Sequence, residues 1–251
     1  MSKETEYYFD NVIDIFKKIK KQSETSINEA ARLMAKSIVE DKLVHIIGPG
    51  GHSNMAAMEV LWRAGGLAAI NALLDPGLAL VHGAKHSNII ERTPGYAKSV
   101  LDNYDIHSEE ILIIANAYGI NSMTIDCALE AKKRQLKTIG ITSTSFANHV
   151  PKDHPARHPS GKNLYEIVDI FIDNYLPLGD AVVKFENFDQ KIAPTSTLCN
   201  CFTLNLLVIK TVEKILNAGE KPPIWMSANM PGGDEANKKW EKKYATRVKH
   251  L

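Results

Sequence analysis

The 251-residue sequence predicts an α/β protein, a three-layer αβα sandwich around a mostly parallel sheet of five strands. Short apolar runs alternate with segments whose apolar residues recur at helical spacing, which is the order of βαβ units. No repeat of fixed period and no low-complexity linker interrupts this order, so we predict one domain over residues 1–251. Apolar residues make up 44% of the chain, enough to fill a core.

The chain begins with a predicted long N-terminal helical arm. Apolar residues recur at helical spacing from Glu4 to Asp41, and the polar stretch Gln22 to Ser26 divides them into one or two helices. A helix of this length before the first strand has little of its own sheet to cover. We therefore expect this arm to pack against a second copy of the chain.

The first strand is predicted at Leu43 to Ile47, and it leads into the glycine-rich turn Gly48 to Asn54. We expect a helix capped by Ser53 or Asn54 to follow and to end at Ala64-Gly65-Gly66. Backbone N–H groups and the positive end of that helix would then favour an anion beyond the strand. The turn lacks the glycine spacing of a dinucleotide-binding fold and the Gly-Lys-Ser/Thr of a P-loop.

The other elements follow in alternation. Strands are predicted at Leu67 to Leu73, Ile111 to Ala115, Lys137 to Thr142 and Val168 to Ile172, with a further edge strand at Ala181 to Phe185. Helices are predicted at Pro94 to Tyr104, Met123 to Arg134 and Thr195 to Leu216, with polar loops at Val81 to Ser87 and Asn148 to Lys162. The tail, residues 222–251, is expected to hold a Gly-Gly turn and a basic amphipathic helix.

Composition narrows the class of protein. A net charge of +1 gives no electrostatic reason to expect nucleic acid or a membrane as partner. The three cysteines show no metal-binding spacing, and their odd number argues against a disulfide framework. The N-terminus has no signal-peptide pattern, and no apolar run approaches the roughly 20 residues of a membrane span. We therefore expect a soluble cytoplasmic protein.

Six short runs carry a family resemblance. They are Gly-His-Ser (51–53), Arg-Ala-Gly-Gly-Leu (63–67), Ala-Leu-Glu-Ala-Lys-Lys-Arg (128–134), Arg-His-Pro-Ser-Gly-Lys (157–162), Pro-Thr-Ser-Thr (194–197) and Gly-Gly-Asp-Glu (232–235). With the element order, they resemble the sugar isomerase (SIS) domain family, and more narrowly a bacterial phosphoheptose isomerase-like subfamily. The resemblance implies the SIS fold, a homodimer or dimer of dimers, and a phosphorylated or otherwise anionic sugar as ligand. We expect no cofactor and no metal.

Three polar turns follow three predicted strands, at 48–54, 116–122 and 143–148. Because parallel strands end at the same edge of a sheet, we expect the turns to converge on one binding site. In the SIS family the first two turns hold the sugar phosphate with hydroxyls and amides. The candidate anion-binding residues are Gly50, Gly51, Ser53, Asn54, Asn116, Asn121, Ser122, Ser143, Arg157, Lys162, Thr195 and Ser196.

The second turn departs from the family pattern. That pattern is Ser-x-Ser-Gly-x-Ser/Asn, but the sequence reads Asn116-Ala117-Tyr118-Gly119-Ile120-Asn121, so two hydroxyls are missing. Each could donate a hydrogen bond to an anion, worth about 1.5–3 kcal/mol. Ser122 and the turn amides could compensate, and the cations Arg157 and Lys162 could supply the lost contacts. Alternatively, the ligand carries no phosphate at this turn.

Glu59 is the predicted catalytic base, six residues into the helix after the first turn. Aldose–ketose isomerisation through an enediol needs a base that moves a proton between neighbouring carbons, and a partly buried glutamate suits this task. The alternative is a surface carboxylate near a helix start. His52 could bind an anion or act as an acid, and His86 lies in a loop expected to reach the site.

Other chemistries are weighed against this one. His149, His154 and His158 could bind zinc, although their spacing is irregular. Ser53 does not fit a nucleophile elbow, because Met55 stands where a glycine is required. His45, inside the first strand, is expected to be a satisfied core group. The predicted function is a sugar-phosphate isomerase; the alternatives are a sugar-phosphate-binding regulatory protein and a SIS-type lyase or etherase.

Overall fold

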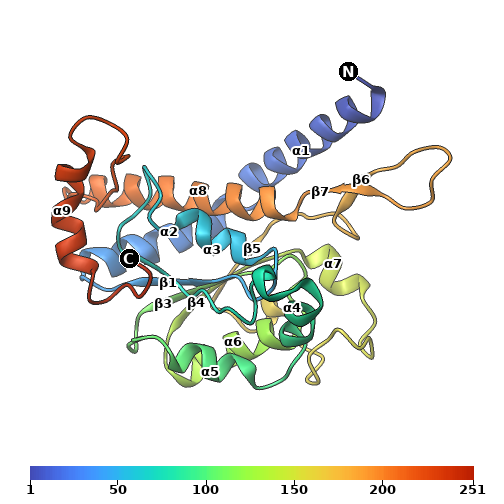
Figure 1. The fold of residues 1–251 in the computed structure, drawn as a ribbon, viewed down its shortest axis with the longest axis horizontal. Coiled ribbons are helices and arrows are strands. Elements are labelled where there is room, and N and C mark those ends of the chain that lie inside the picture. The colour runs from blue at the N-terminus through green and yellow to red at the C-terminus, as the bar shows by residue number, and fades with distance from the viewer.

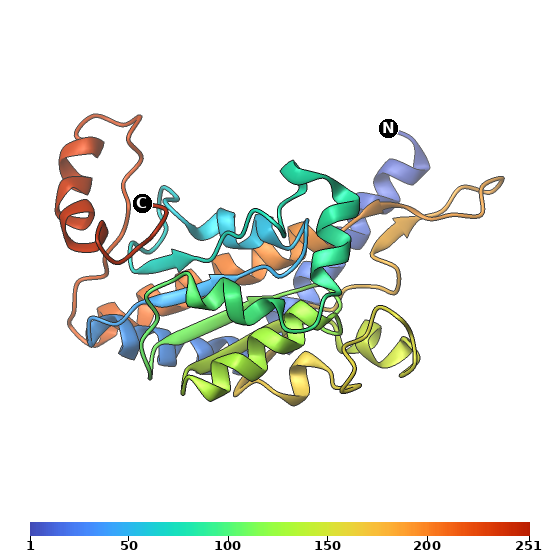
Figure 2. The ribbon, with the colours of Figure 1, turned by 60° about the horizontal axis from the view of Figure 1, so that its bottom comes forward.

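A computed structural model describes residues 1–251, in which a parallel five-stranded sheet lies between layers of helices (Figures 1 and 2). The strands are β1 (Val44–Ile47), β2 (Ile70–Ala72), β3 (Ile111–Ala115), β4 (Lys137–Thr142) and β5 (Ile170–Asp173). Their order is β2-β1-β3-β4-β5, and every neighbouring pair is parallel. The expected α/β architecture is confirmed, and each predicted strand of the sheet is present.

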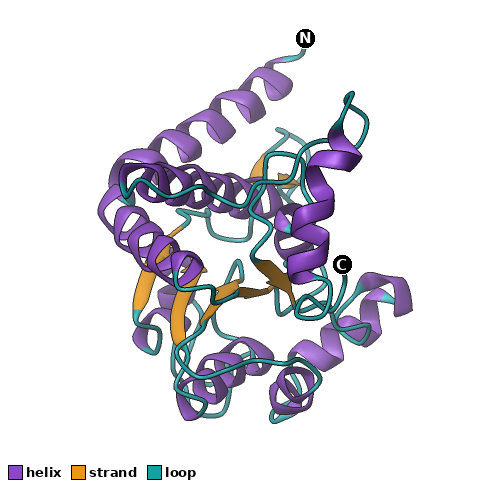
Figure 3. Ribbon diagram, turned by 90° about the vertical axis from the view of Figure 1, so that its left-hand side faces the viewer, coloured by secondary structure: helices purple, strands orange, loops and turns teal.

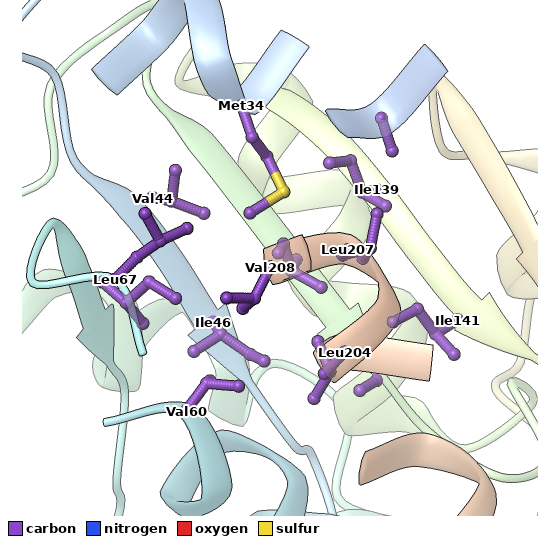
Figure 4. Packing of buried hydrophobic residues seen from close by; sticks show 14 of the residues in the cluster. Met34, Val44, Ile46, Val60, Leu67, Ile139, Ile141, Leu204, Leu207 and Val208 are labelled. Atoms are coloured by element: carbon purple, nitrogen blue, oxygen red, sulfur yellow. The ribbon is translucent and has the colours of Figure 1, made fainter. Parts of the chain in front are cut away.

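Alternate residues of the strands face two hydrophobic cores, as expected for a sheet covered on both faces. Val44 and Ile46 join one core, with α2 (Glu24–Val39), α3 (Asn54–Val60) and α8 (Ser196–Asn217). Figure 4 shows Met34 and Leu207 packed between these strands and helices. Ile47 joins the other core, with α5 (Tyr96–Asp102) and α6 (Ser122–Lys133).

The N-terminal helices form an arm, as predicted. α1 (Lys3–Gln22) is separated from α2 by Ser23, whose hydroxyl donates a hydrogen bond to the Asp173 carbonyl at 2.8 Å. Ile15 and Ile19 are the buried residues of α1, and its first turns project from the body of the molecule (Figure 1). Much of the apolar surface of α1 is therefore not covered by its own chain.

The predicted edge strand at Ala181 to Phe185 is wrong in its placement. β6 (Ala181–Val183) pairs with β7 (Ile192–Pro194) in a separate antiparallel ribbon instead of extending the sheet. This ribbon projects beside the free end of α1 (Figure 1). Both strands of the ribbon are three residues long, and β6 pairs with β7 and with no strand of the five-stranded sheet.

Five helical segments differ from the sequence prediction. The region expected as a loop at Val81 to Ser87 holds a 3₁₀ turn, η1 (Leu80–His82), and α4 (Ala84–Glu91). The third polar turn opens into α7 (Thr144–His149), and a second 3₁₀ turn, η2 (Leu164–Glu166), precedes β5. The helix after the first turn ends at Val60, before the expected Ala64, because Leu61 is extended.

The tail packs at the end of the molecule opposite the arm. α9 (Gly233–Tyr244) is the expected basic helix, and Figure 3 views the molecule from this end, with strands between helical layers. Trp225 packs on Trp62 with ring centroids 4.4 Å apart. Asp41 accepts ion-pair contacts from Lys243 at 2.9 Å and Arg247 at 3.1 Å. No helix of the protein is long and apolar enough to cross a lipid bilayer.

A buried polar chain ties three strands together. His45 Nε2 lies 2.8 Å from Glu110 Oε2, and Asn71 Nδ2 lies 3.1 Å from His45 Nδ1. Burial raises the pKa of Glu110, but hydrogen bonds from His45 and from the amides of His107 and Leu43 outweigh it and hold the pKa at about 2. The prediction that His45 is a satisfied core group is confirmed.

Candidate functional site

A cavity of about 390 Å³ opens where β1 and β3 end. Four segments line it: the first turn (residues 50–53), the second turn (residues 116–121), α4 with η1, and the start of α8 with Asp180. Its wall contains the hydroxyls or amides of Ser53, Ser87, Asn88, Asn116, Asn121, Ser196 and Thr197, but no lysine or arginine. The first two polar turns therefore converge at one edge, and a ligand here would meet mainly uncharged donors.

The glycines of the first turn permit close approaches. A Cβ at Gly48 would lie 1.8 Å from the Ser53 carbonyl oxygen, so no larger residue fits there. The turn closes through a hydrogen bond from the Asn54 amide to the Gly50 carbonyl, 2.9 Å long. The amides of Gly51, His52 and Ser53 have no hydrogen-bond partner in the chain. Three consecutive free N–H groups in a cavity wall can bind an anion.

The expected helix cap in this turn is not made. Ser53 has helical backbone angles and its side chain caps nothing; instead its hydroxyl accepts a 3.3 Å hydrogen bond from Asn116 Nδ2. Asn54 is buried, and both polar atoms of its side chain lack a partner. The Ser53 hydroxyl proton thus remains available to a ligand, whereas Asn54 lies outside the cavity wall.

The second turn is closed by its own first residue. Asn116 Oδ1 accepts hydrogen bonds from the amides of Tyr118 at 3.0 Å and Gly119 at 2.8 Å. These two amides are therefore not free to bind a phosphate. The expectation that the amides of this turn replace the missing hydroxyls does not hold for Tyr118 and Gly119. Asn121 lines the cavity and donates to the Ala156 carbonyl at 3.0 Å, while Ser122 is buried beside it and outside the wall.

The start of α8 is likewise occupied by a side chain of the protein. Asp180 Oδ1 accepts hydrogen bonds from the amides of Thr195 at 2.9 Å and Ser196 at 2.7 Å, and Oδ2 accepts one from the Ser196 hydroxyl. Thr195 is buried, and Ser196 lies in the cavity wall. Asp180 neutralises the positive end of α8, so this helix start offers little to an external anion.

Four other candidate residues lie away from the cavity. Ser143 caps α7 and donates to the Leu176 carbonyl, and the buried Arg157 donates to Asn163 and to the carbonyls of Ala147, Val150 and Pro151. Arg157 thus holds the segment 147–163 together. Lys162 and His86 are exposed, and neither lines the cavity.

Two glutamates have different surroundings. Glu59 lies on α3 outside the cavity wall, with its side chain 25% exposed and Oε1 3.4 Å from both Arg63 Nε and Asn205 Nδ2. Glu91, the last residue of α4, lines the cavity and makes no hydrogen bond or ion pair. Burial raises the pKa of Glu91 to about 7, although the charge of Arg92 opposes the shift.

Sequence reasoning missed Glu91 and Asp180. The only buried residue of α4 is Ser87, so the helix shows no apolar periodicity that would have revealed it. Asp180 lies 15 residues before Thr195, and no spacing rule connects them. The three loop histidines do not gather: His158 pairs with Asp126 and His154 binds the Ala156 amide. No three histidine, cysteine or acidic side chains are arranged to hold a metal ion.

Comparison with known proteins places the chain in a family. The family model of the SIS domain matches residues 7–143, more than half of the chain. A UPF0309 protein from Thermoanaerobacter pseudethanolicus is 40% identical, covering 97% of this chain and 98% of its own. Another, from Geobacillus thermodenitrificans, is 35% identical, covering 96% of this chain and 95% of its own.

A solved structure shares the fold. A phosphoheptose isomerase from Neisseria gonorrhoeae superposes with a TM-score of 0.50 at 15% identity, covering 82% of this chain and 94% of that one. At this identity the likeness concerns the fold and not the chemistry. The family-model match and the two relatives along nearly the whole chain establish the assignment: this protein belongs to the SIS domain family, among the UPF0309 proteins.

Proposed function

We propose that the protein is a SIS-domain isomerase that interconverts the aldose and ketose forms of an anionic sugar. The observation that carries this proposal is the first turn, where the free amides of Gly51, His52 and Ser53 lie in the wall of a 390 Å³ cavity. A cavity of this volume suits a small sugar, and the hydroxyl and amide side chains around it suit sugar hydroxyls.

The reaction moves two protons and needs no oxidant. A base removes the proton from C2 of the aldose, the C–H electron pair forms the C1=C2 bond, and the carbonyl electrons move to O1, which takes a proton. The enediol then receives a proton at C1 from the same group while O2 loses its own proton and becomes the ketone. The hydroxyl protons exchange with solvent, and the protein's task is to hold the enediol and the base together.

The anionic group of the sugar is assigned to the first turn alone. Asn116 occupies the amides of the second turn and Asp180 occupies the start of α8. Residues 51–53 are the run of three consecutive unpartnered amides in the wall. The ligand therefore needs one anionic group, which a phosphate or a carboxylate of a sugar acid can provide.

Proton exchange in heavy water tests the proposal. The protein is incubated with a panel of aldose and ketose phosphates of five to seven carbons and with hexuronates, and proton NMR follows loss of the signal at C1 or C2. We expect exchange and interconversion with at least one sugar of the panel. Binding without exchange would favour the regulatory alternative, and release of a substituent from the sugar would favour the lyase or etherase alternative.

A further inference from the structure

We infer that Glu91 is the group of the cavity that exchanges protons, and that it takes up a proton when an anion binds at the first turn. The catalytic half of this inference rests on the proposed isomerase, whereas the binding half does not. Glu91 terminates α4, which with η1 packs over the glycine turn. The carboxyl group is thereby placed beside the unpartnered amides of residues 51–53.

The packing of Glu91 against the turn is close. A Cβ at Gly50 would lie 2.6 Å from Glu91 Oε2, so the glycine leaves the space that the carboxyl group fills. A Cβ at Gly51 would lie 2.4 Å from Leu80, the first residue of η1. Glycine at both positions lets the segment 80–91 close over the turn, with one carboxyl group directed at it.

Glu91 is free to change its protonation state. Neither of its oxygens has a partner in the chain, so no structural bond breaks when the proton arrives or leaves. Burial raises the pKa of Glu91 to about 7, near the value that is best for a group that both accepts and returns a proton. The Asp180 carboxylate, by contrast, is held by four hydrogen bonds from Thr195 and Ser196 and has a structural task.

The other charged and titratable groups around Glu91 are few. They are Arg92, Lys85 and His86 on or next to its own helix, His82 on η1, His52 in the turn, Tyr118 and Asp180 across the cavity, and Asp126 on α6. Asp126 is bound to His158 and to the Gly95 amide. Of these groups, His52 is the one that belongs to the turn itself and lines the cavity, so the test must separate it from Glu91.

An anion at the turn would stabilise the protonated form of Glu91. Two negative charges a few ångströms apart in a partly enclosed cavity repel each other, so binding is accompanied by proton uptake. In the proposed reaction only those complexes in which Glu91 is ionised turn over: their carboxylate takes the C2 proton from the substrate and returns it to C1. The carboxylate is therefore regenerated at the end of each turnover, and the transferred proton can exchange with solvent only while Glu91 holds it.

The binding test uses sulfate, which does not titrate between pH 5.5 and 8.5. Isothermal titration calorimetry in two buffers of different ionisation enthalpy measures proton uptake. For the parent protein we expect sulfate affinity to fall at least ~5-fold from pH 6 to pH 8, with proton uptake near pH 7. Glu91→Gln should abolish most of this dependence, whereas His52→Gln and the distant surface variant Glu235→Gln should retain it.

The catalytic test compares Glu91→Gln with Glu91→Asp. Glu91→Gln should lower kcat at least ~100-fold without raising KM, because the neutral glutamine does not repel the bound anion, and Glu91→Asp should restore part of the rate and move the acid limb of the pH profile. A Glu91→Gln variant that exchanges at near-parental rate overturns the catalytic assignment. A parent protein inactive on every sugar overturns the proposed isomerase, while the sulfate titration still decides whether Glu91 binds the proton. If the pH dependence of sulfate affinity is unchanged in Glu91→Gln, the inference that Glu91 takes up the proton is overturned.

Discussion

The hydroxyl of Ser53 lies in the cavity wall and accepts one weak hydrogen bond from Asn116. Replacing Ser53 with alanine removes a donor to the ligand but no helix cap, because Ser53 makes none. We expect sulfate or sugar-phosphate affinity to fall about 5- to 15-fold, while the free energy of unfolding changes by less than about 1 kcal/mol. Calorimetric binding and urea unfolding of the same variant measure both. Unchanged affinity would place the anion elsewhere.

The role of Glu59 stays a prediction, and Glu59→Gln tests it. This change keeps the shape and hydrogen-bonding capacity of the side chain but removes its ability to accept a proton. If Glu59 is the enediol base, the Glu59→Gln variant should turn over at least ~100-fold more slowly than the parent. Because Glu59 lies outside the cavity wall and pairs with Arg63, we expect turnover to fall much less in Glu59→Gln than in Glu91→Gln. A larger loss in Glu59→Gln would return the role to Glu59.

At the level of single residues, sequence reasoning located the glycine turn and the second turn but not all that surrounds them. Strand–turn–helix order is visible as local pattern, so Ser53 and Asn116 could be placed at the edge of the sheet. Glu91, whose carboxyl group packs against Gly50, is 41 positions away on a helix without apolar periodicity. Arg157 shows the converse: its charge suggested anion binding, but four protein acceptors surround it, namely Asn163 and the carbonyls of Ala147, Val150 and Pro151.

Among the elements, the link between β1, β2 and the start of β3 depends on one ionised carboxylate. The pKa of Glu110 is lowered from 4.5 to about 2 in the folded protein. A lowered folded-state pKa contributes stability above about pH 4.5, and this contribution is lost as the pH falls toward 2. Its size is about 3 kcal/mol at neutral pH. Urea unfolding at pH 3, 5 and 7 should show the loss.

Glu110→Gln is the matched variant for this measurement. Glu110 uses Oε1 for the Leu43 amide and Oε2 for His45, and glutamine keeps only one acceptor oxygen and no charge. The variant should therefore be less stable at pH 7 and show a smaller decline toward pH 3. The exposed Glu109→Gln, next in the chain, controls for general charge effects. Equal acid sensitivity in parent and Glu110→Gln would show that other carboxylates dominate.

For the molecule as a whole, the five-stranded sheet was predictable from the sequence, whereas the β6–β7 ribbon and the short helices were not. The five parallel strands are local apolar runs, and helices between them allow only crossover connections. The strand at Ala181 to Phe185 was expected at the sheet edge, and β7 was not expected, because a short strand carries no information about its partner. The short helices α4 and α7 were missed because each buries a single residue.

We predict that the protein forms a homodimer through α1 and α8. Large apolar side chains on these helices are exposed in the single chain, including Phe9 at 60% and Ile209 at 60%. Exposed apolar side chains on projecting and neighbouring helices are typical of a subunit interface. Light scattering at micromolar concentration should give twice the chain mass, and Phe9→Lys with Ile209→Lys should give a monomer. Met230→Lys, on the tail, should leave the dimer intact.

The closure of the second turn by Asn116 has a thermodynamic consequence. The Asn116 oxygen behaves as a tethered competitor that never diffuses away, so a phosphate can bind these amides only in the fraction of molecules whose turn is open. Two hydrogen bonds worth about 1 kcal/mol each would make that fraction roughly 3%, and apparent phosphate affinity at this turn would be ~30-fold weaker than its intrinsic value. Asn116→Ser should remove the competing amide oxygen. Titration calorimetry should then detect a second bound phosphate per chain, at the amides of the second turn.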